Sequence, residues 1–187
     1  QLGEDRTALE RLGMLLSGED PGRIHWPPHT VSAGRAEGPL RGGNLAVLGS
    51  LCGTPLQPKF DGCIVLLEDL NEPPDRLDRL CTHLLQSGAF EGVKGIVVGD
   101  LFGTGETSEG RNEVLAERLA PLGVPLVFGA PFGHAGRNQP VSRLRPLRLP
   151  GRGAGAVGAT AGSRPRRPCP PCLPSRAGRG STGAALP

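Results

Sequence analysis

Short, uninterrupted apolar runs alternate along the chain with longer segments in which leucine recurs every three or four positions. Such runs are typical of strands buried on both faces, and the leucine spacing is typical of amphipathic helices. Strands are expected at 63–67, 95–99 and 124–128, and helices at 4–17, 45–52, 72–88 and 109–120. Because strands alternate with helices, the pattern predicts an α/β fold with a mainly parallel sheet.

The N-terminal third of the chain has a less regular pattern. Its helix places one apolar stripe on a single face, formed by Leu9, Leu12, Leu15 and Leu16. Residues 19–34 are rich in Pro, Gly and His, and they predict a connector with a short strand around 30–32. Gly42 and Gly43 predict a flexible turn, and Asn44 is a candidate N-cap for the helix that follows. We therefore expect a connecting helix and linker at 1–33 and an α/β domain at 34–140.

Composition separates the last 47 residues from the rest. Residues 141–187 contain nine Arg, no Asp or Glu, and 16 Gly or Pro. The remaining 12 basic and 18 acidic groups give residues 1–140 a charge of −6, so the overall +3 hides two opposite parts. More than a quarter Gly and Pro without a repeat is typical of low complexity. The sequence therefore predicts a compact acidic domain followed by a disordered basic tail.

Several classes of protein are excluded by composition. The longest apolar runs are far shorter than the roughly 20 residues that span a bilayer, and no secretory leader is visible, so a cytoplasmic protein without a membrane partner is expected. Aromatic residues are scarce, which argues against a base-stacking nucleic-acid surface. Five scattered cysteines do not suggest a disulfide framework. The CPPC at 169–172 lacks a second pair and is interpreted as chance in a Pro-rich tail.

Polar residues follow the predicted strands, at the edge where α/β sheets bind ligands. Glu68 and Asp69 follow the first strand, Asp100 follows the second, and His134 comes shortly after the third. His134 could be a general base or a surface histidine. Glu68 could orient and stabilise that imidazole, or it could be an acid near the start of the next helix. The helix interpretation suits Asp69 and Glu72 better, since both lie nearer the start of that helix.

Two further kinds of chemistry find little support. Glu68, Asp69 and Glu72 could suggest a metal site, but His and Cys at ligand spacing are missing, so no metal is expected. A nucleophile is also missing, because no G-x-S-x-G elbow occurs and no serine shows signs of activation. The serines considered are Ser50, Ser87 and Ser108, and the cysteines Cys52, Cys63 and Cys81 occupy apolar positions typical of a core.

Four segments in sequence order carry a family resemblance. They are GRAEGPLRGGNLAVLGSLCGTPLQP, FDGCIVLLEDLNEPPDRLDRLCTHLLQSGAF, VKGIVVGD and VPLVFGAPFGHAGRNQP, together about residues 34–140. In this combination they resemble the C-terminal domain of the LD-carboxypeptidases, or muramoyltetrapeptide carboxypeptidases. The family also includes the microcin-immunity serine peptidases. Residues 1–17 resemble the helix that connects to this domain.

The resemblance implies a Ser–Glu–His triad, with Glu68 from LED as the orienting carboxylate and His134 from PFGH as the base. Gly43 and Asn44 of GGNL are candidate substrate-binding residues. The family's nucleophilic serine lies in an N-terminal domain, which is expected to precede Gln1 and to be absent here, so this chain alone is expected to be inactive. The implied substrate is a murein tetrapeptide, cleaved at the L,D bond to its terminal D-alanine in cell-wall recycling. The full enzymes are expected to be cytoplasmic homodimers without a cofactor.

The tail departs from the family pattern after PFGH. Its acid-free Arg, Pro, Gly and Ala composition is what GC-rich DNA yields in a shifted frame, so a frameshift near residue 141 is suspected. Two other functions stay open. One is a noncatalytic α/β binding or regulatory module, and the other is a peptidase of the microcin-immunity type.

Overall fold

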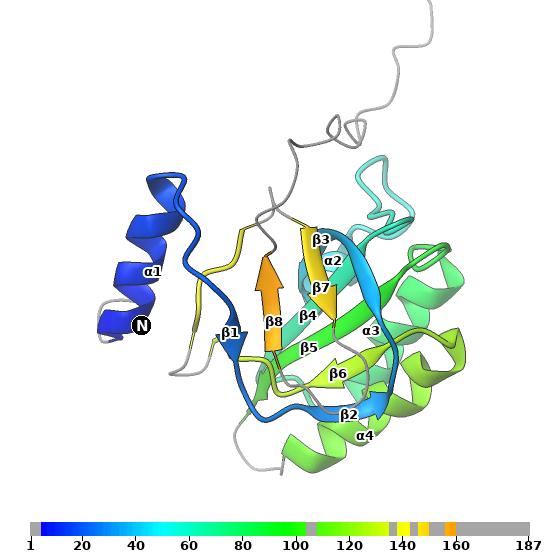
Figure 1. Ribbon diagram of the computed structural model, residues 1–187. Coiled ribbons are helices and arrows are strands. Elements are labelled where there is room, and N and C mark those ends of the chain that lie inside the picture. The colour runs from blue at the N-terminus through cyan, green and yellow to red at the C-terminus, as the bar shows by residue number, and fades with distance from the viewer. Residues whose placement is uncertain (1–4, 104–107, 135–137, 143–145, 150–155, 160–187) are drawn as a thin grey trace, which may run out of the picture.

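The computed structural model describes residues 5–103, 108–134, 138–142, 146–149 and 156–159. Figure 1 shows helices gathered against a strongly curled sheet, with one helix standing apart. The helices are α1 (Arg6–Leu16), α2 (Leu45–Ser50), α3 (Pro74–Gln86), α4 (Ser108–Leu119) and the 3-10 turn η1 (Ala120–Leu122). The strands are β1 (Ile24–His25), β2 (His29–Ser32), β3 (Ala36–Asn44), β4 (Ile64–Leu70), β5 (Gly95–Phe102), β6 (Leu126–Phe128), β7 (Pro146–Leu149) and β8 (Ala156–Ala159).

The sheet has a parallel centre and antiparallel flanks. Its strand order is β1-β8-β7-β3-β4-β5-β6-β2. β3, β4, β5 and β6 pair in parallel, which confirms the predicted α/β arrangement for the centre of the sheet. All the flanking pairs are antiparallel, and the sequence pattern did not predict them. These flanking strands are short and lack the continuous apolar run that indicates β4 and β5.

The sheet curls because its two outermost strands are close neighbours in the sequence. β1 and β2 stand at opposite ends of the strand order, yet only three residues separate them. Four peptide steps reach at most about 14 Å, so the ends of the sheet must approach one another. Trp26 lies in this connection, is buried, and donates from Nε1 to the carbonyl oxygen of Phe128 at 3.4 Å. The short strand expected around 30–32 is therefore confirmed as β2, while β1 lies in residues that were interpreted as a connector.

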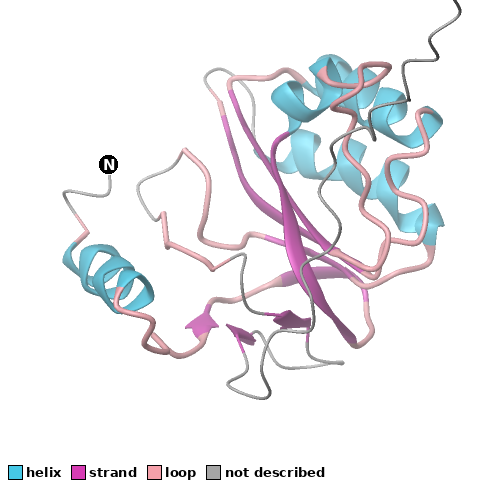
Figure 2. Cartoon of the chain, turned by 90° about the horizontal axis from the view of Figure 1, so that it is seen from above, coloured by secondary structure: helices cyan, strands magenta, loops and turns pink. Residues whose placement is uncertain are grey.

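Two apolar clusters cover the two faces of the central strands. Helices α2, α3 and α4 pack on one face, as Figure 2 shows, and bury Leu77 and Leu84 of α3 against Val65 and Leu67 of β4. The other face curls around a second cluster that includes Trp26, Ile64, Val97, Phe132 and Leu149. Burial on both faces explains why β4 and β5 are continuous apolar runs.

β3 contains the two glycines that were expected to form a turn. Gly42 pairs with Leu66 of β4, and a Cβ atom on Gly42 would lie 1.9 Å from the Leu66 carbonyl oxygen. Its φ of +117° is also one that L side chains rarely adopt. The prediction of a flexible turn was wrong, because the absence of a side chain serves a close approach between two paired strands.

The N-terminal helix buries less than its pattern suggested. Ala8 is the one residue of α1 that is fully buried. Leu16 is 80% exposed and Leu9 45% exposed. The predicted apolar stripe is therefore present in the sequence but is not packed into either core cluster. Within the described residues, no helix is long and apolar enough to cross a membrane.

The basic tail contributes two strands, which corrects the prediction that residues 141–187 do not pack. β7 pairs antiparallel with β3, and β8 pairs with both β7 and β1. Leu147 and Leu149 are buried while Arg148 faces outward, so β7 alternates as a half-buried strand does. Composition concealed this alternation because Arg and Pro surround it. Residues 160–187, including CPPC, lie outside the described residues.

We predict that Leu149→Ala lowers the free energy of unfolding by about 2–4 kcal/mol, because it leaves a cavity beside β3. Arg148→Ala is the matched control on the same strand. Arg148 forms only an exposed ion pair with Glu37, so its loss should cost less than about 1 kcal/mol. Chemical denaturation of both variants measures the difference. If both variants lower the free energy of unfolding by less than about 1 kcal/mol, β7 is not part of the folded domain.

Candidate active site

Polar groups from three segments meet at one edge of the sheet. Asn44, the last residue of β3, pairs with Glu68 in β4. The chain that follows β6 returns to β5, where the Asp100 backbone N–H donates to the Phe132 carbonyl oxygen at 2.9 Å. A Cβ atom on Gly133 would lie 3.2 Å from Glu68 Oε2. The segment that carries the next residue, His134, therefore lies directly over Glu68.

His134 and Glu68, predicted to act together, are in contact. His134 Nδ1 lies 2.7 Å from Glu68 Oε2, although 66 positions separate the two residues in the sequence. A carboxylate only accepts hydrogen bonds, so Nδ1 is the donor and the neutral ring keeps Nε2 as an acceptor. The His134 side chain is 47% exposed and that of Glu68 only 11%. In this arrangement Nε2 is the ring atom left to accept a proton.

Gly133 makes this contact possible. Its φ is +126°, in the region that favours glycine, and a side chain there would press on Glu68. Phe132 precedes it and is buried in the second apolar cluster. The buried ring of Phe132 fixes the backbone at this point, and Gly133 then lets the backbone turn toward Glu68. This local sequence explains how an exposed imidazole is held at a defined place.

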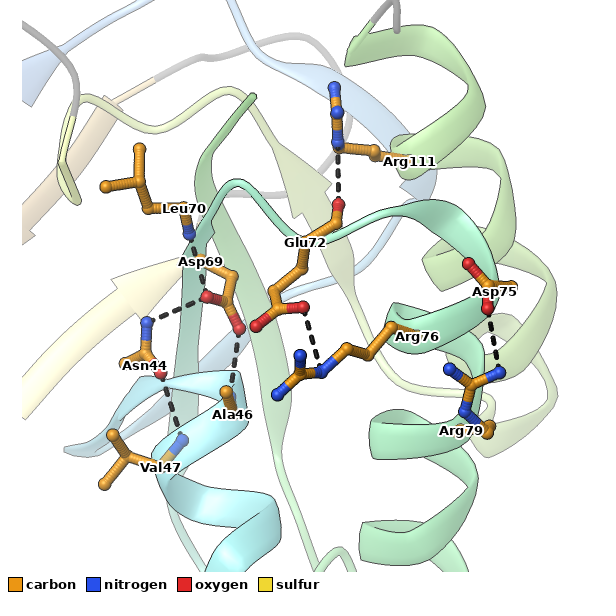
Figure 3. Close-up of polar contacts among 10 residues, drawn as sticks. All are labelled: Asn44, Ala46, Val47, Asp69, Leu70, Glu72, Asp75, Arg76, Arg79 and Arg111. Carbon is orange, nitrogen blue, oxygen red and sulfur yellow. Dashed lines mark hydrogen bonds and ion pairs between the residues drawn. The ribbon is translucent and has the colours of Figure 1, made fainter. Parts of the chain in front are cut away.

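Asp69 has a different partner from the one expected. Its Oδ1 accepts from Asn44 Nδ2 at 3.0 Å and from its own neighbour, the Leu70 N–H, at 2.8 Å, and its Oδ2 accepts from the Ala46 N–H at 2.9 Å. Figure 3 shows Asp69 in contact with Asn44 and Ala46 at the start of α2. Asp69 therefore anchors the preceding helix α2, and the interpretation as an acid for the following helix was wrong. Because β3 pairs in parallel with β4, helix α2, which follows β3, begins closer to Asp69 than helix α3 does.

Asn44 and Gly43, the candidate substrate-binding residues, have different surroundings. Asn44 is the N-cap of α2, as predicted, with Oδ1 accepting from the Val47 N–H at 3.0 Å. Its amide nitrogen is bonded to Asp69, so both polar atoms of Asn44 hold the protein together (Figure 3). Gly43 has no atom within 4 Å of the position where a Cβ would lie. Open space at this strand end leaves Gly43 accessible to a ligand, and its binding role stays a prediction.

Glu72 and Arg111 complete the polar network near this edge. Glu72 forms an ion pair with Arg76 at 3.0 Å, and its carbonyl oxygen accepts from Nε of Arg111 at 2.9 Å. Arg111 is only 3% exposed and comes from α4, as Figure 3 shows. Sequence reasoning missed it, although its spacing from the buried Leu115 and Leu119 places it on the inner stripe of the helix.

In the described part of the chain, no metal site accompanies the His134–Glu68 pair, and the candidate nucleophiles have other partners or surroundings. Among the residues that the structure describes, no group of three His, Cys, Asp or Glu could hold a metal ion. Burial raises the pKa of the Cys81 thiol to about 12, so that thiol is not an activated nucleophile. The hydroxyls of Ser50 and Ser87 donate to backbone carbonyls of their own helices. The Ser108 side chain lies outside the described part of the chain.

Comparisons with known proteins show the family and the fold of this chain. The family described as the LD-carboxypeptidase C-terminal domain matches residues 37–146. A putative carboxypeptidase of Synechocystis is 42% identical over 143 residues, covering 72% of this chain and 46% of that protein. The murein tetrapeptide carboxypeptidase of Pseudomonas aeruginosa is 34% identical over 143 residues, covering 73% and 45%.

A solved structure also matches. The muramoyltetrapeptide carboxypeptidase from Oxalobacter formigenes aligns with a TM-score of 0.68 at 26% identity, covering 82% of this chain and 54% of that one. The chain therefore spans less than half the length of the two curated relatives, and about half of the solved structure.

We predict that Asp69→Ala lowers the free energy of unfolding by about 2–3 kcal/mol, because the donors at the start of α2 lose their buried acceptor. Asp75→Ala is the matched control, since Asp75 forms only an exposed ion pair with Arg79 on α3. Its loss should cost less than about 1 kcal/mol. Thermal and chemical unfolding distinguish the two, and a control as destabilised as Asp69→Ala would contradict the anchoring role.

Proposed function

Because the chain belongs to the LD-carboxypeptidase family, we propose that it supplies the general base and the orienting carboxylate of a serine carboxypeptidase. The proposed reaction is hydrolysis of the L,D bond to the terminal D-alanine of a murein tetrapeptide. The observation that carries this proposal is the 2.7 Å contact between His134 Nδ1 and Glu68 Oε2. The names of the Pseudomonas and Oxalobacter relatives support the substrate class. A cytoplasmic homodimer that acts in cell-wall recycling is proposed on the family resemblance alone.

The mechanism is acyl transfer with His134 as the proton carrier. Nε2 of His134 takes the proton of a serine hydroxyl as that oxygen attacks the scissile carbonyl carbon. The same proton then passes to the departing amine of D-alanine, which leaves an acyl-serine. A water molecule, deprotonated in turn by Nε2, attacks the acyl carbon, and the proton on Nε2 passes to the serine oxygen as the acyl bond breaks. Glu68 keeps Nδ1 protonated and offsets the positive charge of the imidazolium.

The serine is proposed to come from the part of the relatives that this chain does not span. Within the described residues, Glu68 is the one side chain that hydrogen-bonds His134. The His134 side chain is 47% exposed, and its Nε2 is proposed to face a second segment. Gly43, at the open strand end beside β4, is proposed to contact the substrate through its backbone. The 187-residue chain by itself should then release no D-alanine from a murein tetrapeptide, and measurable release would contradict this division of roles.

A chimera tests the proposal in an active context. The N-terminal part of the Synechocystis relative, joined to this chain, should release D-alanine from a murein tetrapeptide. His134→Ala should lower kcat by about 10³-fold or more, because the serine loses its base. Glu68→Gln should lower kcat by about 10²-fold or more, because His134 loses the carboxylate that orients it. Asp75→Ala, an exposed substitution on α3, serves as the control and should keep the parent activity.

The same experiment separates the proposal from its alternative. If the chimera is folded and active but His134→Ala and Glu68→Gln leave kcat unchanged, the pair has no catalytic role. That outcome would favour a noncatalytic α/β binding module. Comparing a murein tetrapeptide with a microcin-type peptide in the active chimera separates the two peptidase specificities, and preference for the second would overturn the proposed substrate.

A further inference from the structure

Helix α1 stands apart from the other helices of the molecule. In Figures 1 and 2 it lies away from the layer formed by α2, α3 and α4. Ala8 is its only fully buried residue, while Leu9 and Leu16 are exposed. Apolar packing therefore does not explain why α1 is held where it is. Polar contacts from Arg11 and from the N-cap residue Asp5 do.

Arg11 ties α1 to two separate parts of the chain. Its Nη1 and Nη2 donate to the carbonyl oxygens of Pro21 at 3.0 Å and Gly22 at 2.8 Å. Its Nε donates to the carbonyl oxygen of Pro140 at 3.1 Å. Partial burial lowers the pKa of Arg11 from its ordinary value, with Asp20 opposing that effect. The planar fork of a guanidinium suits three such acceptors, and an ammonium could not reach them all.

Asp5 makes a second connection to the same region. As the N-cap of α1 it accepts from the Ala8 N–H through Oδ1 at 3.1 Å. Its other oxygen, Oδ2, accepts from Nε2 of Gln139 at 2.9 Å. The backbone N–H of Gln139 donates to the Pro131 carbonyl oxygen at 2.8 Å. Gln139 thus joins the two ends of the segment that carries His134, and Asp5 holds Gln139.

The two sides of the His134 segment are held in different ways. On the incoming side, the Asp100 N–H bonds the carbonyl of Phe132, whose ring is buried, so that side is fixed to β5. On the outgoing side, a hollow of about 390 Å³ is lined by Asp5, Arg11, Trp26, Pro131 and Gln139. Close packing does not fill this space. Residues 139–140 are held by the Gln139–Pro131 backbone bond and by the packing of the adjacent Val141, and the bonds that Asp5 accepts from Gln139 and that Arg11 donates to Pro140 add to this restraint.

We propose that Asp5, Arg11 and Gln139 are positioning residues for His134, forming a clamp through which α1 holds the His134 segment over Glu68. The significance for catalysis rests on the proposed function. Loss of the clamp lets the outgoing side move, so the imidazole spends less time in contact with Glu68. Small misplacements of a catalytic group cost large factors in rate. The clamp therefore acts on kcat and leaves substrate affinity unchanged.

The first test uses the chain itself and needs no activity. In histidine-labelled protein, four imidazoles contribute signals, and His134→Ala identifies the one of interest. Asp5→Ser keeps a capping oxygen and removes the acceptor for Gln139, and Gln139→Ala removes the donor. In both variants, the Nδ1 proton of His134 should exchange with water about tenfold faster, since it leaves Glu68 more often. Arg6→Ala is the control, because Arg6 on the same helix forms only an exposed pair with Glu10.

Unchanged exchange at His134 in both clamp variants, or equal acceleration in Arg6→Ala, would overturn the proposal. The proposal also predicts the behaviour of a double variant. Asp5→Ser and Gln139→Ala remove one shared bond, so the double variant should exchange no faster than either single variant. Arg11→Lys, which keeps the charge, should give the same acceleration because its ammonium cannot bridge the three carbonyls.

Kinetics in the chimera connect the clamp to catalysis. Gln139→Ala should lower kcat about tenfold with KM within about twofold of the parent. If the parent chimera releases no D-alanine, the proposed function fails while the exchange measurement on His134 still decides the clamp. If the chimera is active and depends on His134, but Gln139→Ala matches the parent, the clamp is wrong and the proposed function stands.

Discussion

The close approach of β3 to β4 is the constraint on which the rest of this structure depends. At Gly42 the two backbones pair so tightly that a side chain would overlap the Leu66 carbonyl oxygen. This pairing places Asn44 beside Glu68 and brings the start of α2 within reach of Asp69. One strand therefore presents two adjacent carboxylates with separate tasks, Asp69 anchoring a helix and Glu68 contacting His134.

The strands β4 and β5 and the helix α3 were predictable because their signals are local, whereas β3 was missed because its two glycines indicated a turn. The runs at β4 and β5 and the leucine spacing of α3 each report burial within a few residues. Among the flanking strands, β2 was expected around 30–32, whereas β1 and β7 were missed because they are short and depend on partners distant in sequence. The stripe on α1 was misleading, since spacing indicates an apolar face but not whether another surface covers it.

The candidate site shows the same division between local and distant information. Glu68 and His134 could be paired from the sequence because the carboxyl ends of parallel strands meet at one edge. Asn44 was predictable as an N-cap, while its bond to Asp69 was not. The contact between Asp5 and Gln139 joins residues 134 positions apart, with no local pattern that indicates it.

The central claim is that His134, oriented by Glu68, activates a serine that a different segment supplies. Covalent labelling with a fluorophosphonate tests that activation directly, because the reagent reacts with a serine whose proton a base removes. In the chimera with the Synechocystis N-terminal part, the parent protein should carry the label on one serine of that part. His134→Ala should abolish the labelling while leaving the fold intact. Equal labelling of the parent and His134→Ala would contradict the account.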